Sequence, residues 1–159
     1  MSSTPNQVMF AYTFLNQPAA LSNRSAKDIP AILSIEASFT ITMNDDIYLE
    51  TSLSILEFYK SLYRWKEKIT ETSVPEFHYY SVEFDANETG AIISMIPFSN
   101  RGRIKSIWGE HDRYNVFPLD MLVSSLLDLE QRLKSDIETY FNVQLDKFIH
   151  HIPYTLLDE

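Results

Sequence analysis

Four histidines are the side chains of this 159-residue chain best suited to acid–base or metal chemistry: His78, His111, His150 and His151. No two of them have i,i+4 spacing, and neighbouring histidines on a helix point about 100° apart, so His150 and His151 make a poor chelate. The segment Glu110–Arg113 brings Glu, His, Asp and Arg together and could hold a general base with an orienting carboxylate. Polar loops acquire such combinations without any function, so we expect no catalytic residue here.

Three basic residues alternate along one predicted hairpin, namely Arg101, Arg103 and Lys105. Alternate residues of a strand share one face, so this row could clamp a phosphate or a carboxylate. The same charges on an edge strand would prevent pairing with other sheets, and we favour that interpretation. The acidic pair Asp45 and Asp46 fits turn formation better than a calcium loop.

The composition excludes several classes of function. The chain has no cysteine, which excludes disulfides, thiolate catalysis and zinc sites built from cysteine. Its three glycines, Gly90, Gly102 and Gly109, cannot form a glycine-rich phosphate loop. We therefore expect no metal, no cofactor and no enzymatic activity.

The charge balance bears on the partner. The formal net charge is −9, which repels nucleic acid and anionic lipid and attracts a basic partner, although solubility alone would also favour it. The start of the chain lacks a basic segment followed by an apolar one, and no apolar run approaches the ~18 residues of a membrane span. We therefore expect a cytoplasmic location.

The elements that must position these residues are predicted from periodicity. Alternation of apolar and polar residues predicts a strand over Leu33–Met43, a turn follows at Asn44–Asp46, and Ile47–Glu50 reads as a short strand. Helical spacing predicts two long helices, from Thr51 or Ser52 to Thr70 and from Leu119 to Phe141. The block between them predicts three further strands: Phe77–Phe84, Ala91–Phe98 and Arg103–Trp108.

The order of elements predicts the fold class. Sequential strands joined by short turns favour an α+β fold with an antiparallel sheet of five or six strands and the two long helices packed on one face. Gln7–Leu15 would be the extra strand. We expect a single domain over residues 1–159, with 1–30 as a peripheral N-terminal segment and 143–159 as a C-terminal tail.

Several segments carry a resemblance: Leu33–Phe39, Leu56–Tyr59 with Trp65, Phe77–Phe84 and Lys105–Trp108. Over residues 30–142 they resemble an uncharacterised family of small Bacillus-type bacterial proteins. The chain is also loosely similar to the small acidic immunity proteins of bacterial toxin systems. The second resemblance implies a cytosolic α+β protein that binds and blocks a cognate toxin domain, often a nuclease.

The resulting hypothesis is a non-enzymatic protein-binding module, an immunity protein that neutralises a basic toxin domain such as a nuclease. Its predicted partner-binding residues lie in or beside the three-strand block: Tyr79, Tyr80, Glu83, Asp85, Glu88, Trp108, Glu110 and Asp112. The alternative is a small enzyme or ligand-binding domain with a pocket between sheet and helix, using His111, Glu83, Arg103 or Glu110. Aromatic residues make up 13 % of the chain, and a homo-oligomeric subunit could use them at its interface. We expect no direct binding of nucleic acid or membrane.

Overall fold

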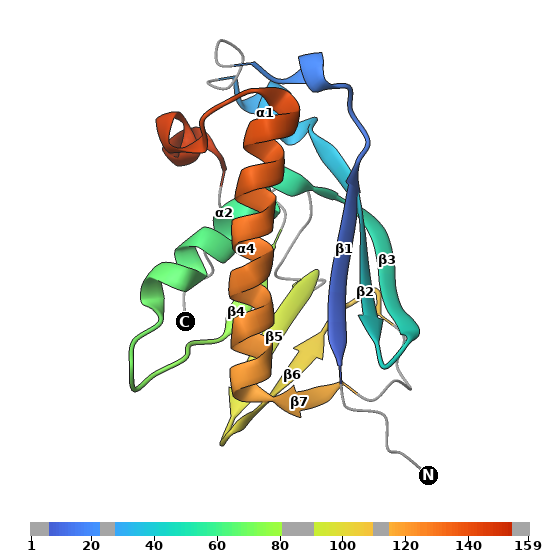
Figure 1. The fold of residues 1–159 in the computed structure, drawn as a ribbon, viewed down its shortest axis with the longest axis vertical. Helices are drawn as coiled ribbons and strands as arrows, with labels where there is room; N and C mark the ends of the chain where they lie inside the picture. Colours follow the sequence, from blue (N-terminus) through green and yellow to red (C-terminus); the bar gives the residue numbers. More distant parts are fainter. Residues whose placement is uncertain (1–6, 23–27, 81–90, 110–114, 154–159) are drawn as a thin grey trace.

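The computed structural model describes residues 7–22, 28–80, 91–109 and 115–153. These ranges form an α+β fold with two antiparallel sheets, one of three strands and one of four (Figure 1). The expectation of one sheet of five or six strands is therefore wrong, although the α+β class and the antiparallel pairing are confirmed. None of the helices in these ranges is both long and apolar enough to cross a bilayer.

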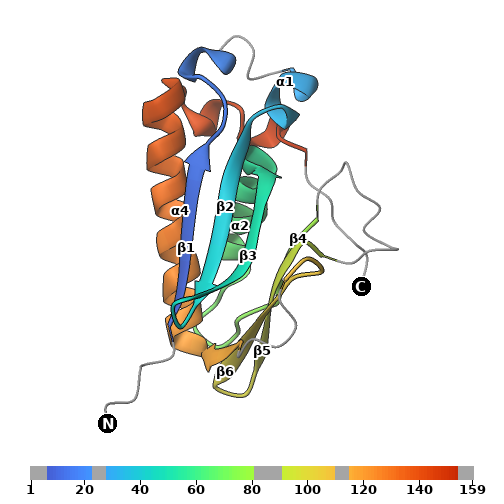
Figure 2. The same ribbon diagram turned by 90° about the vertical axis from the view of Figure 1, so that its right-hand side faces the viewer.

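The first sheet, sheet A, contains β1 (Val8–Phe14), β2 (Glu36–Met43) and β3 (Asp46–Ser54) in that order. Buried and solvent-facing residues alternate along β2, as its sequence predicts. Asn44 and Asp45 adopt positive φ angles of 50° and 74°, which confirms the turn between β2 and β3. Both α2 and α4 lie on one side of this sheet (Figure 2).

The second sheet, sheet B, has the order β4-β5-β6-β7. Its strands are β4 (Phe77–Tyr79), β5 (Ile93–Phe98), β6 (Arg101–Lys105) and β7 (Val116–Pro118). Strand β7 was not predicted, because three residues ending in a proline resemble the entry to the following helix. The predicted strands leave residues 99–102 as the turn before β6. The observed turn is shorter, because Gly102 pairs with Pro97 inside the sheet.

Three α-helices lie in the described ranges: α1 (Ile29–Leu33), α2 (Ile55–Lys68) and α4 (Leu119–Phe141). Helix α4 has the predicted bounds. Helix α2 begins later than predicted because β3 continues to Ser54, which pairs with Glu36 of β2. Helix α1 occupies a stretch predicted as loop and strand, where Pro30 stands in the first helical turn, a position that proline favours.

Aromatic side chains join the two sheets through α2. The ring of Phe58 lies 5.0 Å from Phe39 of sheet A and 5.3 Å from Tyr79 of sheet B. The ring of Trp65, two helical turns after Phe58, lies 5.9 Å from the ring of Phe77. Edge-to-face ring pairs of this kind add about 0.5–1.5 kcal/mol beyond simple burial. Much of the aromatic excess in the sequence therefore belongs to the core.

A buried polar link fastens α2 to α4. Glu130 is only 2 % exposed, accepts a hydrogen bond from the Tyr59 hydroxyl at 2.7 Å and pairs with Lys66 at 2.9 Å. Glu130 therefore faces α2 and not the solvent. A buried carboxylate is tolerated only with such partners, because an unpaired one would carry a large desolvation cost.

The segment after α4 returns to the core through two 3-10 turns, Leu145–Lys147 and Ile149–His151. Its apolar side chains are buried: Val143, Leu145, Phe148 and Ile152. The Lys60 amine of α2 donates a 2.6 Å hydrogen bond to the Ile152 carbonyl. The described part of the C-terminal region is therefore packed against α2.

Candidate protein-binding groove

The structure describes three of the eight predicted partner-binding residues. Tyr79 is fully buried beside Phe58, so its ring is not available to a partner. Tyr80 is half-buried and stacks on His78 at 5.9 Å. Trp108 is 42 % exposed. The other five lie outside the described residues, as does His111: Glu83, Asp85, Glu88, Glu110 and Asp112.

Sheet topology places Tyr80 and Trp108 toward one end of sheet B. Strands β4 and β6 both run antiparallel to β5, so the carboxyl ends of β4 and β6 lie at the same end of the sheet. Tyr80 follows β4, and Trp108 follows β6 by a short turn. The surface hollow described next lies at the opposite end of the strands, and neither Tyr80 nor Trp108 lines it.

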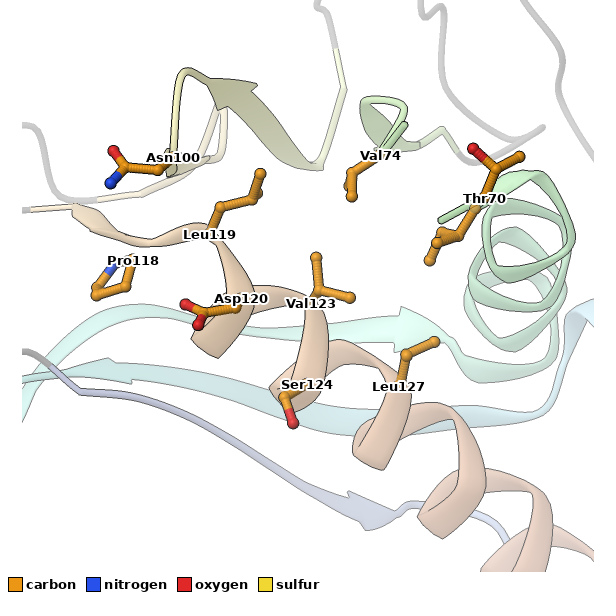
Figure 3. A pocket seen from close by; sticks show the side chains of 10 residues that line it. Thr70, Val74, Asn100, Pro118, Leu119, Asp120, Val123, Ser124 and Leu127 are labelled. Atoms are coloured by element: carbon orange, nitrogen blue, oxygen red, sulfur yellow. The ribbon is translucent and has the colours of Figure 1, made fainter. Parts of the chain in front are cut away.

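An apolar groove of about 680 Å³ opens where three segments meet: the connection after α2, the β5–β6 turn and the start of α4 (Figure 3). Val74 and Val123 point toward each other across it, and Leu119 and Leu127 extend it along α4. A volume of this size is within the range of ligand and side-chain binding sites. The lining residues are Ile69, Thr70, Val74, Asn100, Pro118, Leu119, Asp120, Val123, Ser124 and Leu127.

Helix α4 supplies this wall because it carries two apolar stripes. One stripe is buried in the core and includes Leu122, Leu126 and Leu129. The other, Leu119, Val123 and Leu127, repeats every fourth residue and is only partly buried. A helix that covers a core needs one stripe, so the second was the sequence signal that could have revealed the groove.

Hydrogen bonds and close packing hold the walls in place. The Leu119 amide donates to the Asn100 carbonyl at 2.9 Å, which joins α4 to the β5–β6 turn. The Trp65 indole donates to the Pro75 carbonyl at 2.8 Å and holds the connection after α2. A Cβ atom on Gly102 would lie 2.7 Å from a terminal methyl of Leu122, so any larger residue here would displace that side chain of α4. The groove is therefore preformed.

The chemistry of the groove is that of binding. Of the described residues that line it, only Asp120 is charged, and its Oδ1 accepts a 3.0 Å hydrogen bond from the Met121 amide. The other polar lining residues, Thr70, Asn100 and Ser124, are uncharged. Such a surface can hold apolar side chains and, at the Asp120 rim, a cation. Arg103, a candidate for the enzyme hypothesis, is not in the lining.

A hydrogen-bonded chain on sheet B bears on the enzyme hypothesis. His78 Nδ1 lies 2.8 Å from the Ser94 hydroxyl, and His78 Nε2 lies 2.8 Å from Glu76. This order of hydroxyl, imidazole and carboxylate also occurs in nucleophilic catalysis. Ser94, however, is 6 % exposed, pairs directly with His78 across two strands, and lines neither surface hollow described here. This set of hydrogen bonds is best explained as a link between β4 and β5.

A smaller hollow of about 240 Å³ lies beside the link between α2 and α4, lined by Tyr59, Tyr63, Lys134, Leu145, Asp146 and Ile149. Burial and the neighbouring Glu130 raise the pKa of Tyr59 well above its ordinary value. Its hydroxyl is therefore held in the protonated form and serves as a donor to Glu130. Within the described ranges, no cluster of three or more histidines or carboxylates is placed to hold a metal ion.

The fold and the groove together define the class: an α+β protein of two antiparallel sheets with a preformed apolar groove on its surface. Residues 10–139 match the family described as a domain of unknown function, DUF7878, and the chain belongs to this family. No curated protein and no solved structure matches it.

Proposed function

We propose that this protein is a non-enzymatic protein-binding module whose groove receives apolar side chains of a basic partner segment. The observation that supports this most is the second apolar stripe of α4, which borders the core, stays only partly buried and lines a preformed hollow. Apolar grooves of this kind accept amphipathic helices, with apolar residues at i, i+3 or i+4 as anchors.

Charge favours a basic partner. Among the described residues that line the groove, one is acidic and none is basic, and the chain carries a net charge of −9. Charge complementarity accelerates association and selects partners more than it adds affinity. A basic toxin domain, for example a nuclease, has the required sign, so neutralisation of such a domain is the specific form of this proposal.

A model peptide tests the groove directly. The probe is an amphipathic Leu–Lys helix of about five turns, compared with a Leu–Glu helix that has the same apolar face. We expect binding of the Leu–Lys peptide only, with NMR shift changes at Val74, Val123 and Leu127. Equal binding of the two peptides, or shift changes away from these residues, would contradict the proposal.

Two substitutions separate apolar contact from charge. Val123→Asp removes an apolar anchor while adding a negative charge, so weaker binding of the Leu–Lys peptide must reflect lost burial; we expect about tenfold. Ser135→Asp adds the same charge at an exposed position of α4 outside the groove and serves as the matched control. Unchanged affinity of a folded Val123→Asp variant would overturn the assignment of the groove.

The toxin hypothesis has a separate test. A polypeptide encoded beside this chain, with a basic C-terminal domain, is expressed in bacteria with and without the chain. We expect growth arrest by the domain alone and rescue by the wild-type chain but not by Val123→Asp. Rescue that fails although the two proteins bind would leave a binding module that is not an immunity protein.

A further inference from the structure

The basic row of Arg101, Arg103 and Lys105 does not lie on an edge strand. Strand β6 pairs with β5 on one side and with β7 on the other. The prediction that these charges protect an edge strand from aggregation is therefore wrong at Arg101 and Arg103, where the backbone of β6 is paired on both sides; Lys105 lies beyond the pairing with β7. The row needs a different explanation.

All three side chains are exposed on one face of β6, while Gly102 and Ile104 between them are buried. None of the three takes part in an ion pair with another residue of the described ranges. The other two arginines of the described ranges do form ion pairs, Arg64 with Glu67 and Arg132 with Asp128. The molecule is strongly acidic as a whole, yet this row presents three exposed cations that form no ion pair with a described residue.

Cross-strand neighbours give this face apolar borders at Arg101 and Arg103, whereas Lys105 lies opposite the polar Ser94. Arg101 lies opposite Phe98 of β5 and Pro118 of β7, and Arg103 lies opposite Ile96 and Val116. Directly opposed residues of antiparallel strands share a face. Phe98 is 43 % exposed, so its ring is accessible beside Arg101. Apolar borders reduce the screening of ion pairs formed between them.

We propose that this face of sheet B binds an acidic peptide segment in an extended conformation. Alternate residues of β6 repeat at about 6.8 Å, and alternate carboxylates of an extended peptide repeat at the same distance. A segment of the pattern acidic-x-acidic-x-acidic therefore matches the three cations in register. This site goes beyond the proposed function because it has the opposite charge and lies on the outer face of sheet B, whereas the groove is at the edge next to α4.

Charge also favours a short peptide over nucleic acid. Three cations match a local charge of the same number, and a longer polyanion would leave the row and meet the negative field of the molecule. Phe98 offers an apolar contact at one end of the row, next to Arg101. The occupant is therefore a peptide of limited length, belonging to a second partner or to a distal part of the first.

The test is an NMR titration with an acetylated, amidated Glu-Thr-Glu-Thr-Glu peptide. We expect weak binding, with a dissociation constant on the order of a millimolar, and shift changes along β6 and at Phe98. Replacing all three bases with glutamine (Arg101→Gln, Arg103→Gln, Lys105→Gln) should weaken binding roughly tenfold, since each exposed ion pair contributes a small factor. The matched control removes the same charge at exposed lysines elsewhere: Lys68→Gln, Lys134→Gln and Lys147→Gln.

The outcomes are distinct. Loss of peptide affinity in the β6 triple variant but not in the control variant supports the site. If the β6 triple variant unfolds, a smaller loss of affinity in the single Arg103→Gln variant supports it instead. Equal loss in both triple variants means that only net charge matters and overturns it. Tighter binding of a five-nucleotide oligothymidylate than of the peptide, or self-association abolished by the β6 substitutions, assigns the face to nucleic acid or to a second copy and also overturns it. None of these results depends on the Leu–Lys peptide.

Discussion

Tyr59 and Glu130 show how a buried pair sets the response of this protein to pH. Burial and Glu130 both disfavour the phenolate, so the pKa of Tyr59 is higher in the folded chain than its ordinary value of 10.0. Above about pH 10 the unfolded chain loses this proton and the folded chain keeps it. The folded state then binds more protons, so the free energy of unfolding falls as pH rises through this range and is unaffected by Tyr59 below it.

The prediction concerns Tyr59→Phe. It should lower the free energy of unfolding at neutral pH by about 1–3 kcal/mol, because Glu130 loses a hydrogen-bond donor in a buried site. It should also reduce the decline of stability at alkaline pH, measured by urea unfolding between about pH 8 and 11. Tyr12→Phe should reduce the decline as well, since burial and Asp136 raise the pKa of Tyr12. A decline identical in the wild type and both variants would contradict this account.

Helix α4 separates stability from binding on two neighbouring stripes. Leu126 is 1 % exposed in the core stripe, so Leu126→Ala should lower the free energy of unfolding by about 2–5 kcal/mol. Val123 is half-buried in the groove stripe, and Val123→Ala should cost less than about 1 kcal/mol. Binding of the Leu–Lys peptide should fall for Val123→Ala and persist for Leu126→Ala wherever that variant remains folded. Urea unfolding and calorimetric titration of both variants check this pairing.

An element can be predicted from the sequence when the interactions that form it join residues close in the chain. The bounds of α4 and the alternation along β2 were predicted because they depend on residues close in the chain. Strand β7 was missed because three residues carry no period, and only pairing with β6 makes them a strand. The start of α2 was misplaced because Ser54 pairs with Glu36, a long-range contact. Tertiary pairing therefore overrides local propensity at these boundaries.

The division into two sheets is a property of the whole molecule. Short turns predicted antiparallel neighbours correctly, but α2 separates β3 from β4, and Phe58 packs against both sheets. Nothing in the local pattern shows that the strands before and after this helix do not pair. The groove was missed for a related reason, because Val74, Asn100 and Val123 meet only in the folded chain. The exposure of single aromatic residues on predicted strands was harder to predict, since Tyr79, a predicted partner-binding residue, is buried.

The charge of the whole molecule predicts how a basic partner associates. A net charge of −9 extends attraction beyond the groove, so the association rate of the Leu–Lys peptide should fall steeply with ionic strength. Apolar contacts with Val123 and Leu127 keep the complex together, so the dissociation rate should change little. Stopped-flow measurements of both rates at about 0.1 M and 1 M salt check this prediction, because the Debye length falls from about 10 Å to about 3 Å between these concentrations.

Two variants complete this prediction by dividing the effects. Asp120→Asn keeps an acceptor for the Met121 amide and removes one charge at the rim, so it should slow association modestly. Val123→Asp should instead accelerate dissociation, because it removes apolar burial without reducing the negative field. If salt changed the dissociation rate as strongly as the association rate, ion pairs would be holding the bound peptide in place. The groove would then contribute little to binding, and the second stripe of α4 would need another explanation.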